Sequence, residues 1–260
     1  MILCVSIGNT NIRCALGTPG NYRQALIKTR NIASAKCFAD FLCKSFGKEL
    51  QLLTGGIFSS VVPHKNTDIL HAIKLLSTGS TPVPISPIDI AKMSVDFSGY
   101  KSAIGEDRAV CSMAAAKKYG APVIVIDFGT ATTINVVNEN NAYIGGAILA
   151  GVQTGINALA KDTARLPQLD LSESSLAGMG LIGNDTHTCI ISGAVIGAAC
   201  AAEGYVQRIQ SVFSESLVPP PMVIITGGNA SKVMPHCGFE FTYEPNLLIE
   251  GLFMHYEITR

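Results

Sequence analysis

The sequence lacks an excess of charge of either sign. Nineteen Lys and Arg residues balance nineteen Asp and Glu residues, so the formal net charge is zero. No basic run could neutralise a row of phosphates, which excludes nucleic acid as the main partner. Charged residues make up only 15% of the chain and hydrophobic residues 48%, a balance that predicts a folded protein.

Long apolar runs are also missing. A transmembrane helix needs about 18–20 consecutive apolar residues, and the apolar stretches here are broken by Gly, Ser or Asn. The segment from Met1 to Gly8 has neither the basic start nor the cleavage site of a signal peptide. We therefore expect a cytoplasmic protein with no membrane partner. The eight cysteines contain no C-x-x-C pair, and we expect them to be reduced and buried.

Three common enzyme motifs are absent. The chain has no G-x-x-x-x-G-K-[ST] loop, no G-x-G-x-x-G after its first strand and no G-x-S-x-G elbow. These absences exclude a P-loop kinase, a Rossmann dehydrogenase and an α/β-hydrolase. The histidines show no metal-ligand spacing, so we expect all five to be structural: His64, His71, His187, His236 and His255.

What the sequence does contain is an internal repeat at an offset of 121 residues. Residues 2–13 read ILCVSIGNTNIR and residues 123–134 read VIVIDFGTATTI, which places Ser6 over Asp127. Each copy is an apolar strand, a turn with Gly, Thr and Asn, and a second strand, a pattern typical of a β-hairpin. Such a turn offers backbone N–H groups to a phosphate. One such segment could be only a good turn sequence. Two copies half a chain apart predict two similar domains with a ligand cleft between them.

The remaining patterns favour an α/β fold in two halves. Helical spacing covers 34–46, 67–76, 108–118, 186–209 and 247–258, and further strands are expected at 55–63, 142–148 and 223–226. The loop after Lys118 marks the boundary, so we expect domains at 1–118 and 119–260. The helix over 186–209 carries small residues that would permit close approach of another helix.

Two further segments could carry chemistry. Gly105-Glu106-Asp107-Arg108 opens a helix, where Asp107 could accept a proton from an attacking hydroxyl and Arg108 could hold an anion. The alternative is a helix start with acids in its first turn, which favours the dipole. Thr226-Gly227-Gly228-Asn229 follows an apolar strand and could let an adenine ring lie against the backbone, or it could be an ordinary turn.

Together the motifs closely resemble one family, the type III pantothenate kinases of bacteria, which belong to the actin, sugar-kinase and heat-shock-protein superfamily. The resemblance covers nearly the whole chain. It rests on IGNTN from Ile7, SSVVP (59–63), GEDR (105–108), DFGTATTIN (127–135), GGAILAG (145–151), ALAKDTARLP (158–167), NDTHTCIISGAVIG (184–197) and TGGNA (226–230).

The resemblance implies a fold, an activity and a set of site residues. The fold would be two duplicated ribonuclease-H-like (actin-like ATPase) domains, and the activity an ATP-dependent phosphorylation of pantothenate, the first step of coenzyme A biosynthesis, by a homodimer. Asp107 would be the general base, Asp127 would lie at the metal, and the cations would be Mg²⁺ and K⁺ or NH₄⁺. The pantothenate-binding residues would be Tyr100, Gly105, Glu106, Asp107, Arg108 and Thr186. The ATP-binding residues would be Ser6, Ile7, Gly8, Asn9, Thr10, Asn11, Gly129, Thr130, Thr132, Gly227 and Gly228.

The chain departs from the family pattern at a few positions. Ser6 stands where the first hairpin of the family has Asp, Asn135 stands where Asp is common, and Ala150 stands where Pro is usual. Tyr100 lies closer to GEDR than the family aromatic does. Losing a carboxylate beside a divalent cation removes an electrostatic partner. Three interpretations remain open: an active kinase with altered metal use, a catalytically weak paralogue that binds pantothenate or nucleotide in a regulatory role, and a related kinase or binding module with another substrate.

Overall fold

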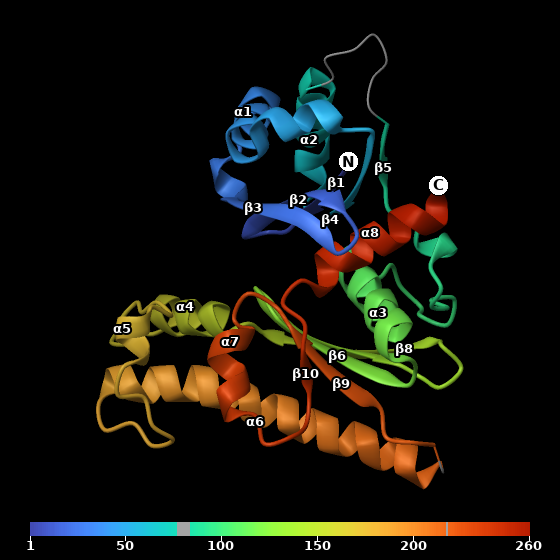
Figure 1. Cartoon of the computed structure of the whole chain (residues 1–260). Helices are drawn as coiled ribbons and strands as arrows, with labels where there is room; N and C mark the ends of the chain where they lie inside the picture. The colour runs from blue at the N-terminus through green and yellow to red at the C-terminus, as the bar shows by residue number, and fades with distance from the viewer. Residues whose placement is uncertain (77–83, 217) are drawn as a thin grey trace. The chain divides into compact units, whose positions relative to one another are not determined.

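The computed structural model describes residues 1–76, 84–216 and 218–260. The chain forms two compact units (Figure 1). The first unit comprises Met1–Ala114 and Asn246–Arg260, and the second comprises Ala115–Pro245. The division falls inside helix α3 (Glu106–Tyr119).

The first unit is built on a five-stranded mixed sheet in the order β3-β2-β1-β4-β5. Its strands are β1 (Ile2–Ile7), β2 (Asn11–Thr18), β3 (Asn21–Lys28), β4 (Gly55–Ser60) and β5 (Ile85–Pro87). The first three are antiparallel, whereas β4 and β5 run parallel to β1 because α1 (Ala35–Phe46) and α2 (Pro63–Leu76) cross over between them. Ser34 caps α1 by accepting from the Cys37 amide.

Both faces of the first sheet are covered. Alternate residues of β1, Leu3, Val5 and Ile7, pack into one core with α1 and α2. The opposite face contacts the terminal helix α8 (Leu247–Thr259) through β1, β2 and β4. Ser6 points to this opposite face because side chains alternate along a strand.

The second unit repeats the same topology. Its sheet runs β10-β9-β6-β7-β8, with β6, β7 and β8 antiparallel and β9 and β10 parallel to β6. The strands are β6 (Val123–Phe128), β7 (Ala131–Val137), β8 (Tyr143–Ala150), β9 (Met222–Thr226) and β10 (Thr242–Tyr243). The helices are α4 (Val152–Asp162), α5 (Glu173–Leu176), α6 (Thr186–Glu215) and α7 (Ala230–Val233). The duplicated ribonuclease-H-like fold is therefore confirmed.

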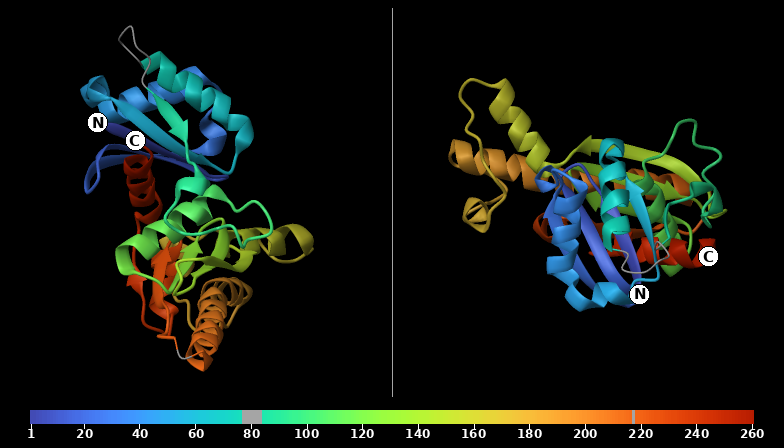
Figure 2. Two further views of the ribbon diagram at one scale, coloured as in Figure 1. Left: turned by 90° about the vertical axis from the view of Figure 1, so that its right-hand side faces the viewer. Right: turned by 90° about the horizontal axis from the view of Figure 1, so that it is seen from above.

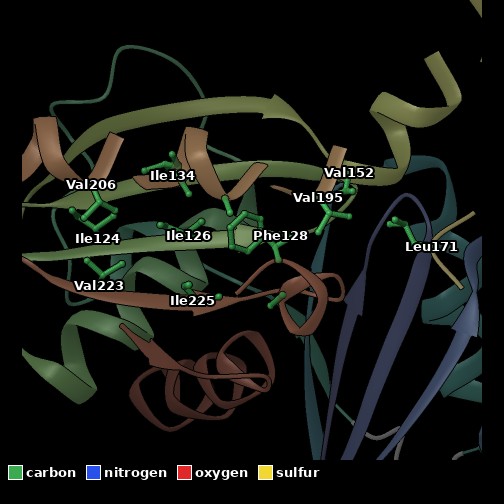
Figure 3. Close-up of a cluster of buried hydrophobic side chains, with 14 of the residues drawn as sticks. Ile124, Ile126, Phe128, Ile134, Val152, Leu171, Val195, Val206, Val223 and Ile225 are labelled. Atoms are coloured by element: carbon green, nitrogen blue, oxygen red, sulfur yellow. The ribbon is translucent and has the colours of Figure 1, made fainter. Parts of the chain in front are cut away.

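The long helix α6 covers one face of the second sheet (Figure 2). Its buried side packs on the sheet through Ile191, Val195 and Val206, which join Ile124, Ile126 and Phe128 in one core (Figure 3). Short 3₁₀ turns complete the two units: η1 (Thr29–Asn31), η2 (Gly47–Leu52), η3 (Ile90–Lys92) and η4 (Met234–His236).

Three details differ from the sequence expectations. The terminal helix packs on the first sheet although it ends the second half of the sequence, because its apolar face covers β1. The first strands of the repeat keep the offset of 121, but the second strands are offset by 120, since Ile7 pairs with Ile12 and Phe128 with Thr132. All cysteines are free, but three lie on the outer faces of α1 and α6 and are exposed: Cys43, Cys189 and Cys200.

Helix α6 also has the length and hydropathy of a membrane-spanning helix. The search for unbroken apolar runs in the sequence did not predict such a helix. Its apolar window gains its hydropathy from Ile, Val, Ala and Cys, and Gly and Ser interrupt the apolar run. Such a composition is also that of a core helix, and 39% of the window is buried inside the protein. We therefore treat this property as weak evidence for a membrane.

Candidate active site

The Asp127 carboxylate lies between two glycines near the end of β6. A Cβ on Gly129 would lie 3.2 Å from its Oδ1, and a Cβ on Gly227 would clash with the same carboxylate and with the Phe128 backbone. Gly227 also has a φ of 104°, which side chains rarely adopt. The second hairpin and the TGGNA segment therefore fit together because Gly227 has no side chain, and a side chain at Gly129 would crowd the same carboxylate.

Asn229 connects these two segments directly. Its backbone N–H donates to the Phe128 carbonyl at 2.9 Å, and its Nδ2 donates to the Gly129 carbonyl at 3.3 Å. We did not single out Asn229 among the site residues of the sequence, although its place just after Gly-Gly was the available signal. Asp127, Gly129, Thr130, Gly227 and Gly228 thus form one continuous edge of the second unit.

The two hairpin turns close in similar ways. The Gly8 amide donates to the Asn11 carbonyl at 3.0 Å, and the Gly129 amide donates to the Ala131 carbonyl at 3.1 Å. These two N–H groups are already used inside the turns, so a backbone donor to a phosphate would be another amide of each turn. The exposed tips are Asn9 and Thr10 in the first turn and Thr130 in the second.

Two predicted nucleotide-binding residues have their side chains inside the protein. Ile7 is 1% exposed and Thr132 is 4% exposed. Thr132 takes the position of Ile12 rather than that of Asn11, because the second turn is one residue shorter than the first. Only the backbone of these residues is available to a ligand.

The GEDR segment starts α3 in the first unit. The Asp107 Oδ1 accepts from the Arg108 amide at 2.8 Å, and a Cβ on Gly105 would lie 2.9 Å from the same oxygen. The Glu106 Oε2 accepts from the Ser60 amide at 2.6 Å. Glu106 therefore anchors the start of α3 to the end of β4, in the SSVVP segment, and is placed as a positioning residue.

Charged groups of this segment influence one another. Burial raises the pKa of Glu106, the Ser60 amide opposes that effect, and the charge of Asp107 adds to it. The Arg108 guanidinium lies 6.0 Å from the centre of the Tyr100 ring, and hydrogen bonding to Arg108 lowers the pKa of the Tyr100 hydroxyl. The structure thus brings Tyr100, Gly105, Glu106, Asp107 and Arg108 together.

Thr186 lies elsewhere, at the first turn of α6 in the second unit. Asp185 caps this helix, and its carboxylate accepts a hydrogen bond from the Thr188 amide at 2.7 Å. Thr186 does not act as the cap, and it is exposed. It borders a cavity of about 710 Å³ between α4 and α6. Three of the sequence motifs line this cavity, through Ala150, Gly151, Gly155, Leu159, Leu166, Thr186, Cys189 and Gly193.

Asp127 is the candidate ligand for a divalent cation at this edge of the second unit. Among the described residues, no three His, Cys, Asp or Glu side chains gather closely enough to hold a metal by themselves. Mg²⁺ is usually held by one or two carboxylates, with phosphate oxygens and water completing its shell. Asp127 lies between Thr133 and Thr226 on the neighbouring strands, so this set of hard oxygen donors fits a nucleotide-bound Mg²⁺.

Solved structures share the fold. A putative 2-dehydro-3-deoxygalactonokinase from Sinorhizobium meliloti matches with a TM-score of 0.57 at 13% identity, covering 100% of this chain and 99% of that one. The ethanolamine utilization protein EutJ from Carboxydothermus hydrogenoformans matches with a TM-score of 0.54 at 14% identity, covering 97% and 89%. At such identities the likeness concerns the fold alone.

Comparison of amino-acid sequences identifies the family. The chain is 33% identical to the type III pantothenate kinase of Rhodococcus jostii strain RHA1, over 99% of this chain and 95% of that protein. It is 30% identical to the type III pantothenate kinase of Moorella thermoacetica, over 99% of both. The profile of the family described as type III pantothenate kinase matches residues 2–208. The chain therefore belongs to the type III pantothenate kinase family.

Proposed function

We propose that this protein transfers the γ-phosphoryl group of ATP to the primary hydroxyl of pantothenate, giving 4'-phosphopantothenate for coenzyme A biosynthesis. The observation that carries the proposal is the match over 99% of the chain to proteins named type III pantothenate kinase. The GEDR segment supports it, since a carboxylate and a guanidinium stand side by side at the start of α3.

Asp107 acts on the acceptor. One of its oxygens accepts from the Arg108 amide, which leaves the other free to take the proton of the attacking hydroxyl. Arg108 offers its guanidinium to the pantothenate carboxylate, a pairing that guanidinium geometry favours. Tyr100 and Gly105 border this pair, and Thr186 provides a further hydroxyl for pantothenate.

The two hairpins hold the nucleotide. Asn9, Thr10 and Thr130 at the turn tips contact phosphate oxygens, and the Gly227-Gly228 backbone lies against adenosine. Phosphoryl transfer depends mainly on positioning and charge stabilisation, so these fixed turns contribute by orienting the phosphates. Asp127 holds Mg²⁺, which when bound neutralises phosphate charge. Asp127 also binds a monovalent cation, K⁺ or NH₄⁺.

We further propose a cytoplasmic homodimer that joins through α6. Gly193 and Gly197 lie on the exposed side of α6, and a Cβ at either would meet nothing within 4 Å. Leu181 and Ile182, just before this helix, are also exposed. A second copy would cover these apolar groups, which a monomer leaves in water.

The ligand test is a thermal shift series. Ligands stabilise only the states that bind them, so pantothenate and ATP should each raise the melting temperature, and glucose should not. A shift with glucose but none with pantothenate would contradict the proposed acceptor. Arg108→Gln should remove the pantothenate shift and keep the ATP shift, whereas the exposed Arg208→Gln should keep both.

The weak-paralogue interpretation is less favoured than the kinase. The chain keeps Asp107, Arg108 and Asp127, and its similarity to named kinases runs from end to end. Ser6 remains the feature that the family pattern does not explain.

A further inference from the structure

Two threonine hydroxyls hold carbonyl groups of the two hairpin turns. In the first unit, the Thr29 Oγ1 donates to the Gly8 carbonyl at 2.6 Å, and the Thr29 amide donates to the Thr10 carbonyl at 3.0 Å. In the second unit, the Thr154 Oγ1 donates to the Thr130 carbonyl at 2.7 Å. Each turn is therefore bonded to a threonine that lies outside its own hairpin.

The two threonines come from corresponding segments of the duplicated fold. Thr29 directly follows β3, and Thr154 lies in the first turn of α4, just after β8. The strands β3 and β8 are the third strands of their sheets, and each ends beside the start of the second strand. At the repeat offset of 121, however, Thr29 aligns with Ala150 and not with Thr154. The two units thus make the same contact from different sequence positions, which the internal repeat does not predict.

A held carbonyl also fixes the N–H group that follows it. A peptide unit is planar and trans, so the C=O of one residue and the N–H of the next point in opposite directions. The hydroxyl on the Gly8 carbonyl therefore sets the direction of the Asn9 N–H. Thr154 sets that of the Ala131 N–H in the same way. The two threonines determine how the turns present their backbone.

The N-terminus of α4 strengthens this arrangement in the second unit. A Cβ on Gly151, the N-cap residue of α4, would clash with the carbonyl oxygens of Gly129 and Thr130. These oxygens therefore lie at the positive end of the helix dipole, which attracts them. The start of α4 holds the second turn through both the dipole and the Thr154 hydroxyl.

We propose that Thr154 and Thr29 are positioning residues for the nucleotide, acting through the turns rather than on the nucleotide itself. Thr154 is exposed, so water could satisfy its hydroxyl equally well and its bond adds little to the stability of the fold. Its effect is to keep the second turn in one shape. The inference rests on the proposed function, in which the turns hold ATP.

The test is isothermal titration of Thr154 variants with ATP and magnesium. Thr154→Val removes the hydroxyl at nearly unchanged volume and should weaken ATP binding about three- to tenfold, as expected for one lost hydrogen bond. Thr154→Ser keeps the hydroxyl and should restore ATP binding. The matched control is Thr259→Val, which removes a hydroxyl that donates to a helix carbonyl at 3.0 Å near the end of α8. It should bind ATP as the wild type does.

Steady-state kinetics separate positioning from general damage. Thr154→Val should raise the KM for ATP and leave the KM for pantothenate unchanged. Its melting temperature without ligand should equal that of the wild type, because the lost bond is exposed. A merely structural role would instead lower the melting temperature and leave the affinity of the folded protein for ATP intact.

Thr29→Val provides an independent variant in the first unit. It should weaken ATP binding by a similar factor. Thr29 is 5% exposed, so the Gly8 carbonyl would lose its partner inside the protein and the melting temperature should fall as well. If Thr29→Val does not fold, Thr154→Val and Thr154→Ser decide the proposal by themselves.

Two results would overturn the proposal. One is unchanged ATP binding in folded Thr154→Val. The other is ATP binding by Thr154→Ser that is as weak as that of Thr154→Val, because the hydroxyl would then not be what supports the turn. Failure of the proposed acceptor would look different. The wild type would bind ATP without a thermal shift with pantothenate, and the ATP titrations would still decide the role of Thr154.

Discussion

In the proposed function, Asp107 is the residue on which the chemistry depends. Its Oδ1 accepts from the next amide and leaves one oxygen for the substrate hydroxyl, while neighbouring Glu106 is tied to the Ser60 amide. The two adjacent acids therefore differ in their contacts, since Glu106 is bound to the backbone of β4 and Asp107 to that of α3. The family resemblance implies that both contact the substrate, and the sequence gives no sign that Ser60 lies beside the start of α3.

Replacing Asp107 should separate catalysis from binding. We expect Asp107→Asn to lower kcat by about 10²–10⁴-fold, since an amide cannot accept the hydroxyl proton. The dissociation constant for pantothenate should change little. Steady-state kinetics and calorimetry measure the two quantities. The control is Glu106→Gln, which removes the neighbouring charge but keeps an oxygen for the Ser60 amide. Near-normal turnover by Asp107→Asn would show that another group takes the proton.

At the scale of elements, the glycines of the second unit determine how closely its segments pack. Gly227 touches the Asp127 carboxylate and the Phe128 backbone, which requires both a positive φ and the absence of a side chain. Gly151 likewise has no room for a Cβ, because the carbonyls of Gly129 and Thr130 lie against it. These contacts fix the second turn from two sides.

Gly227→Ala should therefore destabilise the fold by more than the backbone strain at this position alone would. An alanine at positive φ costs roughly 1–2 kcal/mol, and here the displaced carboxylate adds to that cost and weakens ATP binding. Gly178→Ala is the matched control, since Gly178 has a φ of 76° but open space around its Cβ. Urea unfolding and ATP titration of both variants measure the effects. Equal destabilisation of the two variants, with normal ATP binding, would show that the contact with Asp127 is unimportant.

The exposed glycines of α6 provide a test of the proposed dimer. Gly197→Arg adds a large charged side chain at an exposed position where a Cβ would meet nothing within 4 Å. We expect it to shift the proposed dimer to monomer in light scattering without lowering the melting temperature of the monomer. The control is Gly20→Ala, in the turn between β2 and β3 of the first unit, which also has open space around its Cβ and should leave the dimer intact. A wild type that is monomeric at all concentrations would contradict the dimer directly.

Much of the arrangement of helices and strands could be predicted from the sequence. The hairpins, the helices at 35–46 and 186–215 and the duplicated order of strands follow from apolar periodicity and turn residues. The one-residue difference between the turns could not be predicted, because an ungapped alignment of the repeat looks equally good on both strands. The position of Arg13 beside Ser6 could not be predicted either, because it depends on the register in which β1 and β2 pair.

At the scale of the whole molecule, the C-terminal helix holds a buried histidine that links stability to pH. His255 on α8 accepts from the Asp89 amide through its Nε2 at 3.0 Å. Burial lowers the pKa of His255, the charge of Asp89 opposes this effect and that of Lys92 adds to it. The neutral imidazole is therefore the form that the fold accommodates, because a proton on Nε2 would meet the Asp89 N–H.

Stability should accordingly fall in mild acid. The unfolded histidine titrates near pH 6.5, above its folded value, so the contribution is fully present above that pH and is lost as pH falls toward the folded pKa. We expect a lower urea midpoint at pH 5.5 than at pH 7.5, and a smaller difference in His255→Gln. His71→Gln, an exposed histidine, should keep the wild-type difference. An unchanged difference in His255→Gln would assign the acid sensitivity to other groups.

The most direct measurement of the central claim is product formation by the wild-type protein. Purified protein is incubated with ATP, pantothenate, magnesium and potassium, and phosphopantothenate is followed by mass spectrometry, with Asp107→Asn as the blank. We predict stoichiometric product from the wild type and an initial rate of product formation about 10²–10⁴-fold lower from the variant. Pantothenate that stays unmodified while it still raises the melting temperature would contradict the kinase, and would identify a binding protein on a kinase fold.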